Sequence, residues 1–205
     1  MAIAGRVGAV WISDINVAPT AFTTQATTAD GARLRYQVTN GAFRYWPLDA
    51  TITVFRNAVP VTTGFTLERA GGFVVFDVAQ GGGDTITVSG SALTVITAGG
   101  MFNWSVEPEA ESADATTFAS NGWKEFRQTD RAWSGSAEAF WGGDQLFKSW
   151  GNIIVVRLFV DAGASQRCYE GFALITTDSV ESPVDGLIEE SIDFEGIGPL
   201  YFRNL

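Results

Sequence analysis

Short runs rich in Thr, Val, Ile and Phe recur along nearly the whole chain, and turns rich in Gly separate them. Very little of the sequence repeats at the helical period of 3.6 residues, whereas several runs alternate with the period of two that a strand shows. The pattern therefore predicts an all-β protein, with an N-terminal region rich in β-hairpins. The only helix is expected at Asp144–Trp150, where Leu146 and Trp150 lie four residues apart.

The expected strands fall into two sets, which the glycine pair at 99 and 100 separates. The first set comprises Val7–Ile12, Leu34–Val38, Ile52–Arg56, Phe65–Arg69, Phe73–Val78 and Thr85–Ser89. The second set comprises Phe102–Val106, Ala115–Ala119, Trp123–Arg127, Trp133–Trp141, Asn152–Val160, Cys168–Thr177, Leu187–Glu195 and Leu200–Phe202. We expect three regions: an N-terminal strand and arm at 1–24, a β-rich inserted or outer domain at 25–97, and a core domain at 98–205.

Alternation within two of these strands predicts the faces that are buried. The odd positions of Trp133–Trp141 are Trp, Gly, Ala, Ala and Trp, so one face of that strand is apolar. In the run from 188 to 195, one face carries Ile188, Glu190, Ile192 and Phe194. The opposite face is acidic and carries Glu189, Ser191, Asp193 and Glu195.

The net charge of −10 arises entirely in the second half of the chain. Residues 1–100 hold six Arg and six acidic residues, whereas residues 101–205 hold seven Lys or Arg and seventeen Asp or Glu. An acidic surface repels nucleic acid through the same Coulomb force that draws basic proteins to it. The charge therefore argues against direct DNA binding, but it suits a surface past which DNA moves without sticking.

Few residues are suited to catalysis. Histidine is absent, which removes the commonest general base and metal ligand. Cys168 is the only cysteine, so no internal disulfide forms, and its strand-like surroundings predict a buried, inert thiol. We therefore expect no enzyme activity, no cofactor and no metal. Carboxylate pairs such as Glu189 and Glu190 keep a glycosidase as a distant alternative.

Two further ligand classes are disfavoured. Four nearby acids lack the Asp-x-Asp-x-Asp-Gly spacing that gives a calcium loop its specificity: Glu107, Glu109, Glu111 and Asp114. The seven Trp residues are dispersed, so they are expected to pack in the core and in interfaces more than to form a carbohydrate platform. No run approaches the ~20 consecutive apolar residues of a membrane span, so no membrane partner is expected. The apolar start ends at Asp14 without a signal-peptide cleavage site.

Three passages of the second half share features with a known family. They are Asp114–Glu125 followed by Trp133–Ser136, the strand Asn152–Val160 with Tyr169–Ile175, and the ending Val184–Gly198. Together they resemble the major tail tube proteins of long-tailed bacteriophages, whose fold is shared with the tube protein of type VI secretion. The ending, with its Gly-x-Gly exit, is the most specific. Residues 30–95 resemble hairpin modules of such tail proteins more loosely.

This resemblance implies a β-sandwich or split barrel whose subunits close into a sixfold ring, and rings that stack into a hollow tube. The function implied is that of a structural subunit of the virion tail, assembled in the host cytoplasm, which lines a DNA-conducting channel with an acidic lumen. The implied partners are other copies of the chain and other tail proteins, such as the tape measure and the tail terminator. DNA passes transiently during genome ejection, without specific binding.

The resemblance also suggests positions for the functional residues. The acidic residues Glu189, Asp193 and Glu195 are expected at the lumen or on the ring surface. Contacts between subunits are expected from 1–12 and 114–125, with these residues foremost: Val10, Trp11, Ile12, Thr117, Phe118 and Trp123. Residues 30–95, with no net charge, are expected to face outward. The alternatives are a carbohydrate-binding or adhesive β-sandwich module, and a tail-completion or baseplate ring component.

Overall fold

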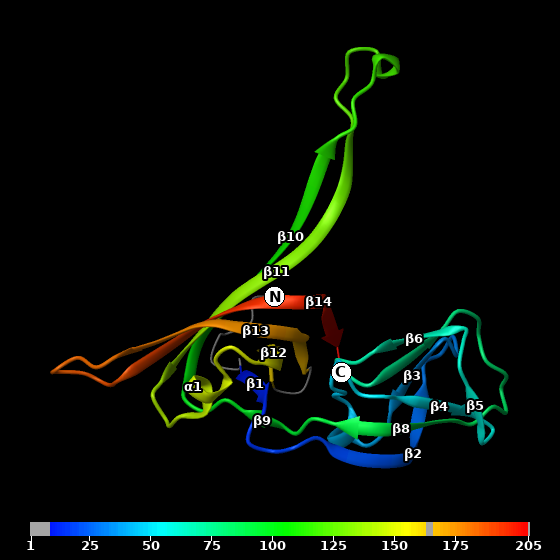
Figure 1. Cartoon of the computed structure of the whole chain (residues 1–205), viewed down its shortest axis with the longest axis horizontal. Helices are drawn as coiled ribbons and strands as arrows, with labels where there is room; N and C mark the ends of the chain where they lie inside the picture. The colour runs from blue at the N-terminus through cyan, green and yellow to red at the C-terminus, as the bar shows by residue number, and fades with distance from the viewer. Residues whose placement is uncertain (1–8, 163–165, 205) are drawn as a thin grey trace. The chain divides into compact units, whose positions relative to one another are not determined.

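The computed structural model describes residues 9–162 and 166–204. Within these ranges the strands form two antiparallel seven-stranded sheets, accompanied by a single five-residue α-helix, α1 (Gln145–Ser149). Figure 1 shows both sheets and the hairpins that extend from one of them. The prediction of an all-β fold with one short helix is therefore confirmed.

The chain forms two compact units. The first comprises Met1–Ala98, Val155–Glu170 and Arg203–Leu205, and the second comprises Gly99–Ile154 and Gly171–Phe202. Three strands have residues in both units: β12 (Ile153–Asp161), β13 (Arg167–Glu181) and β14 (Glu189–Asn204). The predicted division into regions 1–24, 25–97 and 98–205 stays a prediction.

The first unit holds a complete sheet with the strand order β5-β4-β8-β2-β3-β7-β6. Its strands are β2 (Thr20–Ala29), β3 (Arg35–Val38), β4 (Thr53–Arg56), β5 (Val59–Val61), β6 (Phe65–Glu68), β7 (Phe73–Phe76) and β8 (Ile86–Ala92). A register shift between Phe22 and Gln25 bends β2, and Thr24 takes a positive φ of 48° there. The strand pairs with β8 on both sides of this bulge and with β3 near its end.

This bend creates the core of the first unit. Side chains from both halves of the sheet, such as Val54 on β4 and Phe76 on β7, pack in one cluster with the fully buried Trp46. Because residues from distant strands of one sheet meet there, the sheet curls around its own apolar face. The Trp46 indole nitrogen donates a hydrogen bond to the Phe43 carbonyl in the short 3₁₀ turn η2 (Gly41–Phe43).

The other sheet has the strand order β10-β11-β14-β13-β12-β1-β9. In the first unit, β1 (Ala9–Ser13) pairs with β12 on one side and with β9 (Val95–Thr97) on the other. In the second unit, β10 (Met101–Asp114) pairs with β11 (Phe126–Phe140), and β11 pairs with β14. The 3₁₀ turn η3 (Phe118–Ser120) lies between β10 and β11.

Within β11 and β14, burial follows the alternation seen in the sequence, whereas Trp141 and Ile188, also expected on the apolar faces, lie just outside these strands and are exposed. Trp133, Ala137 and Ala139 are buried on β11, and Ile192 and Phe194 are buried on β14. The intervening acidic face of β14 is exposed. The glycines at 171 and 196 make room for the Trp133 indole, because a Cβ at either position would clash with it.

Several local predictions were wrong. The segment Ala115–Ala119 is not a strand but the start of a capped loop that contains η3, and Trp123–Arg127 enters a strand only at Phe126. Leu187–Glu195 and Leu200–Phe202 are parts of one continuous strand, β14. Strand β2 was not predicted, because its exposed Thr residues show no apolar alternation. Of the predicted strand Val7–Ile12, residues 7 and 8 lie outside the described residues.

Candidate functional site

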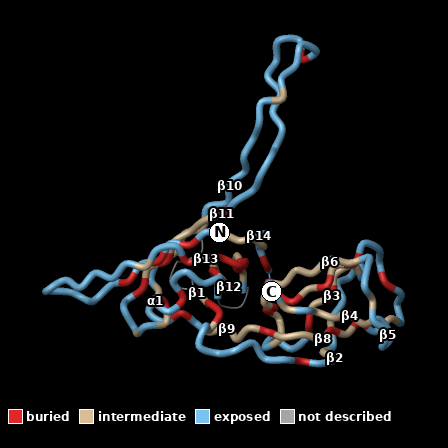
Figure 2. Tube along the Cα trace, viewed as in Figure 1, coloured by how far each residue is buried: buried red, intermediate tan, exposed pale blue. Residues whose placement is uncertain are grey.

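The β10–β11 hairpin is a long two-stranded ribbon in the second unit. Its pairing runs from Met101 opposite Ala139 to Asp114 opposite Phe126. Every residue from 107 to 114 and from 126 to 132 is exposed, as the pale blue trace in Figure 2 shows. An isolated two-stranded ribbon is only marginally stable in water. A partner that covers the exposed part of this hairpin would therefore stabilise it.

The tip of this hairpin presents aromatic side chains to solvent. Phe118 is 110% exposed and Trp123 is 80% exposed. Local hydrogen bonds nevertheless order the loop: the Thr117 hydroxyl caps η3, and the Ala115 amide donates to the Glu125 carbonyl. Large apolar side chains gathered in one exposed, ordered loop mark an interaction surface.

The edges of this ribbon are open. β10 is the terminal strand of its sheet, and the pairing of β11 with β14 covers only Ser134–Phe140. Among the described strands, the Phe126–Trp133 stretch of β11 therefore pairs with β10 alone. Pro108 has no backbone N–H to donate, which suits an edge position. Unpaired backbone groups along such edges can pair with a strand of another chain.

A second exposed hairpin, formed by β13 and β14, ends in an apolar and acidic loop. Every residue from 181 to 189 is exposed. Val184 is 100% exposed and Leu187 is 64% exposed, with Asp185 between them. Glu181 and Glu189 flank the loop, so its charge is wholly negative.

One face of the second unit forms a shallow acidic depression of about 310 Å³. Hydroxyl and carboxylate side chains dominate its lining, which comprises Ser105, Glu107, Ser134, Gly135, Ser136, Thr176, Asp193, Phe194 and Glu195. The Ser105 and Ser136 hydroxyls lie 3.0 Å apart and share a hydrogen bond. No Lys or Arg lines the depression, so this face repels phosphate groups.

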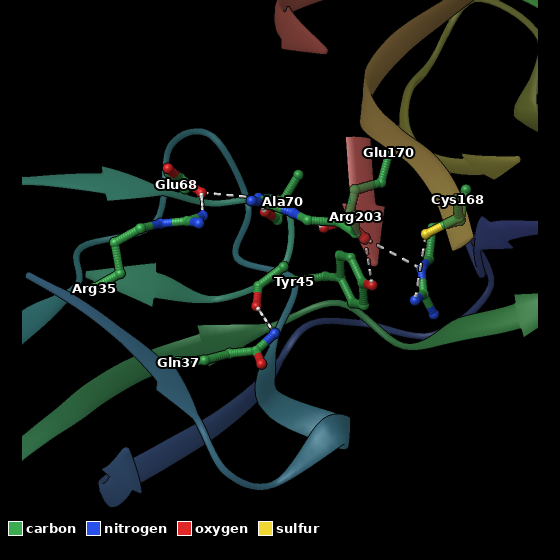
Figure 3. A network of polar contacts seen from close by, with 10 residues as sticks. Arg35, Gln37, Tyr45, Glu68, Ala70, Cys168, Glu170 and Arg203 are labelled. Atoms are coloured by element: carbon green, nitrogen blue, oxygen red, sulfur yellow. Dashed lines mark hydrogen bonds and ion pairs between the residues drawn. The ribbon is translucent and has the colours of Figure 1, made fainter. Parts of the chain in front are cut away.

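A buried network of charged groups centres on Glu170 in the first unit (Figure 3). The Glu170 side chain is 1% exposed, and its carboxylate accepts hydrogen bonds from Arg203 Nε at 2.8 Å and from the Tyr45 hydroxyl at 2.9 Å. Arg157 Nε lies 3.3 Å from the same carboxylate. Burial, followed by the Glu170 charge, raises the pKa of Tyr45 well above its ordinary value. The phenol is therefore neutral and acts as a donor.

Arg203 links this centre to the curled sheet. Its guanidinium donates to Glu68 Oε2 at 2.9 Å and to the Ala70 carbonyl at 3.0 Å, and Arg35 pairs with the same Glu68 oxygen at 2.6 Å. Although burial alone lowers the pKa of Arg203, its bonds to Glu170 and Glu68 raise it above its ordinary value. The network therefore fastens the end of β14 to β6 through the Arg203 guanidinium.

The described residues offer little catalytic chemistry. Cys168 is buried, and burial, followed by the nearby Glu170 charge, raises the pKa of its thiol to about 11. A thiol with this pKa is protonated at neutral pH and is a poor nucleophile. Within the described ranges, no cluster of three or more His, Cys, Asp or Glu residues is suited to a metal ion. None of the helices described there is long and apolar enough to cross a membrane.

The predicted site residues occupy contrasting environments. The acidic residues Glu189, Asp193 and Glu195 are all exposed on one face of β14. Phe118 and Trp123 are exposed at the hairpin tip, with Thr117 capping the turn beside them. Val10 and Ile12 are buried in the first unit's own sheet, whereas Trp11 is half-buried and lines a pocket. The structure therefore leaves the side chains of Trp11 and the tip accessible to another chain.

Sequence reasoning missed the charged network and the pocket beside it. Glu170 follows Cys168 and Tyr169 in an otherwise apolar run, and an isolated acid in such a run is the one local signal of a buried ion pair. Its partners are distant in the sequence, since Tyr45 lies 125 positions away. No spacing rule connects residues so far apart.

The fold and these surfaces define an all-β protein with two exposed, apolar hairpin loops and an acidic sheet face. No family model matches the chain, and no curated protein matches it. Among solved structures, it is similar to a chain in the tail of an empty gene transfer agent (GTA) particle with C6 symmetry, at 18% identity over 54% of this chain and 87% of that chain, with a TM-score of 0.44.

A chain in the virion of a native gene transfer agent particle is similar to the same degree. It shares 18% identity over 53% of this chain and 88% of that chain, with a TM-score of 0.44. Likeness at this level carries no argument about function. The function proposed below therefore rests on the chain's own residues.

Proposed function

We propose that this chain is a structural subunit of a phage-type tail tube, which forms stacked, hexameric rings around a DNA-conducting channel. The observation that carries the proposal is the β10–β11 hairpin, with its open edges and its exposed tip residues Phe118 and Trp123. Neither feature stabilises an isolated chain. Both suit a protein whose exposed edges and apolar tip are covered by other copies of the same chain.

The geometry favours a contact between different surfaces of neighbouring copies. A hairpin that reaches away from its sheet presents a surface unlike the one it would contact. Contacts of this head-to-tail kind close into rings when the rotation between copies closes, and they stack into tubes when a second such surface lies along the axis. Strand pairing at the open edges supplies main-chain hydrogen bonds, while the aromatic tip supplies apolar contact.

The acidic face of β14 is assigned to the channel in this proposal. Glu189, Asp193 and Glu195 project from one side of the strand, beside the serine-rich depression. A wall of like charge neutralises no phosphates, so contact with it releases no counterions from DNA, and DNA slides past without adhering. The region 25–97, which holds most of the curled sheet, is assigned to the outside of the tube. The other partners are tail proteins such as the tape measure and the terminator.

Sedimentation velocity over a range of protein concentrations tests the proposal. The wild-type chain is expected to form large species as its concentration rises, without any ligand. The double variant F118S/W123S removes the two aromatic side chains from the tip and is expected to shift assembly to at least about tenfold higher concentration. The control F147S removes a side chain that is 61% exposed on α1 and is expected to assemble normally. Equal assembly of all three proteins would contradict the role of the tip.

A carbohydrate-binding module is the second candidate, because three tryptophans are accessible on the second unit. Trp123, Trp141 and Trp150 are 80%, 51% and 55% exposed, and indole faces stack well on sugars. Trp150 Nε1 donates a hydrogen bond to the Thr176 carbonyl, which fixes its ring. Saturable binding to a glycan array by a chain that stays monomeric would favour this candidate over the tube subunit.

A further inference from the structure

A pocket of about 280 Å³ in the first unit combines aromatic walls with a nearly buried guanidinium. Its lining comprises Trp11, Gly41, Ala42, Tyr45, Leu93, Thr94, Val95 and Arg157. The Arg157 guanidinium carbon lies 5.7 Å from the Trp11 ring centre and 5.3 Å from that of Tyr45. An apolar pocket with one convergent charged group is the usual form of a recognition site.

Arg157 has unused hydrogen-bonding capacity in this pocket. Its side chain is only 11% exposed, yet its Nε atom has no hydrogen-bond partner, although it lies 3.3 Å from Glu170 Oε2. One terminal nitrogen donates to Cys168 Sγ at 4.0 Å, which is a weak bond. A guanidinium carries five N–H donors and acts as a strong ligand for carboxylates. The guanidinium therefore holds donor capacity that Glu170 and Cys168 do not fully use.

The surrounding charges also favour an anion. The network holds three cations, Arg35, Arg157 and Arg203, and two anions, Glu68 and Glu170, which gives a net charge of 3 − 2 = +1. Arg203 forms ion pairs with both Glu68 and Glu170, so Arg157 shares the Glu170 carboxylate with Arg203. Because a partly compensated buried charge is costly, a carboxylate that enters the pocket gains both Coulomb energy and hydrogen bonds.

The geometry points to a specific occupant: the β13–β14 loop, residues 182–188, of a second copy of this chain. Asp185 then accepts hydrogen bonds from Arg157, while Val184 and Leu187 pack against the aromatic walls formed by Trp11 and Tyr45. The loop is fully exposed and has its carboxylate between two apolar side chains, as the pocket requires. The loop follows the opposite end of β13 from Glu170, and the contact is assigned to another copy in keeping with the proposed self-assembly.

Charge complementarity selects this loop over the β10–β11 tip. From 178 to 189 the sequence holds no Lys or Arg and four acidic residues: Asp178, Glu181, Asp185 and Glu189. In the other tip, Lys124 separates Trp123 from Glu125, so a cation would approach Arg157 together with the indole. The contact rests on the proposed self-assembly, and it adds to it a second, electrostatic interface.

Cysteine cross-linking between copies tests this contact. The native Cys168 is buried, so engineered thiols dominate the chemistry. When T94C and V184C chains are mixed at assembling concentration and oxidised, a disulfide-linked pair of one T94C and one V184C chain is expected. The matched control replaces T94C by V59C, whose position on β5 is 64% exposed and outside the pocket, and it is expected to give at least about tenfold less of the mixed product.

A charge variant of the loop gives an independent readout that leaves the buried network untouched. D185K is expected to raise the concentration for half-assembly by at least about tenfold, whereas D144K, at an exposed acid beside α1, leaves it unchanged. Tubes that form normally but give no preferential T94C–V184C product would overturn this contact and leave the tube subunit intact. A wild-type chain that stays monomeric at every concentration would overturn both.

Discussion

The carboxyl groups of Asp178 on β13 and Glu190 on β14 lie close together near the loop that joins these strands, and three of their four oxygens are buried without a hydrogen-bond partner. Glu190 is 3% exposed, and no ion pair to either group occurs within residues 9–162 and 166–204. Burial, followed by the charge of Asp178, raises the pKa of Glu190 to about 7. Burial also raises the pKa of Asp178.

This pair makes stability depend on pH in a direction that can be worked out. The pKa of Glu190 is about 7 in the folded chain and 4.5 ordinarily, so between these values the folded chain holds a proton that the unfolded chain has lost. The free energy of unfolding is therefore expected to fall as pH rises through this range, by at most about 3 kcal/mol. Urea denaturation at pH 5 and pH 8 measures the difference.

The variant E190Q removes this titration. At pH 8 it is expected to unfold at a higher urea concentration than the wild type, because its side-chain amide stays neutral. At pH 5 the two proteins are expected to unfold at nearly the same urea concentration. E189Q, on the exposed face of the same strand, is the control and keeps the wild-type pH dependence. An unchanged pH dependence in E190Q would exclude Glu190 as its source.

Trp133 and Gly196 test the packing of the second unit. The Trp133 indole is 4% exposed, and its nitrogen donates to the Gly198 carbonyl at 3.0 Å. A Cβ at Gly196 would overlap the indole ring, so G196A is expected to destabilise the fold by about 2 kcal/mol or more. The control is G142A, whose Cβ would meet only the Phe140 carbonyl, at 3.9 Å. Equal chemical denaturation midpoints for the two variants would contradict this packing.

The sequence predicted the strands that have one buried face, since alternation reports burial directly. It assigned Ile192 and Phe194 to the core and Asp193 to the acidic face, as the structure shows. It ended the first strand of the second half at Val106, whereas β10 continues to Asp114, because the extension is exposed on both faces and leaves no alternating pattern. Pairing with β11, and not side-chain burial, defines that segment.

Local hydrogen bonding explains another error. Ala115–Ala119 has the composition of a strand, but the Thr117 hydroxyl and Ser120 form a capping box, and Asn121 adopts a left-handed φ of 47°. These side-chain bonds compete with strand pairing and close the loop. At the candidate site, the exposed tip lay within the predicted contact region. The pocket around Arg157 was not predicted, because it combines residues from strands distant in the sequence.

The buried network predicts a large energetic cost for one conservative change. E170Q removes the charge that Arg157 and Arg203 share, and it is expected to destabilise the chain by about 3–5 kcal/mol. In contrast, D144N removes the exposed ion pair with Lys148 and is expected to leave the denaturation midpoint unchanged. Thermal and urea unfolding compare the two. A mild effect of E170Q would mean that the arginines find other partners.

The acidic face of β14 leads to a prediction about DNA binding by the assembled rings. Wild-type assemblies are expected not to retain double-stranded DNA, whereas the triple variant E189K/D193K/E195K is expected to retain it at low salt and release it at high salt. The control carries three charge reversals at exposed positions elsewhere: Asp49, Asp77 and Asp144. Filter binding over a salt series gives the measurement. Equal retention by control and triple variant would contradict the lumen assignment.

Negative-stain electron microscopy of the purified wild-type chain, concentrated without ligand, tests the central claim most directly. If other copies of the chain cover the β10–β11 hairpin, as proposed, the images show sixfold rings or hollow tubes. Isolated monomers at every concentration would contradict the tube subunit and favour a module that binds its ligand alone.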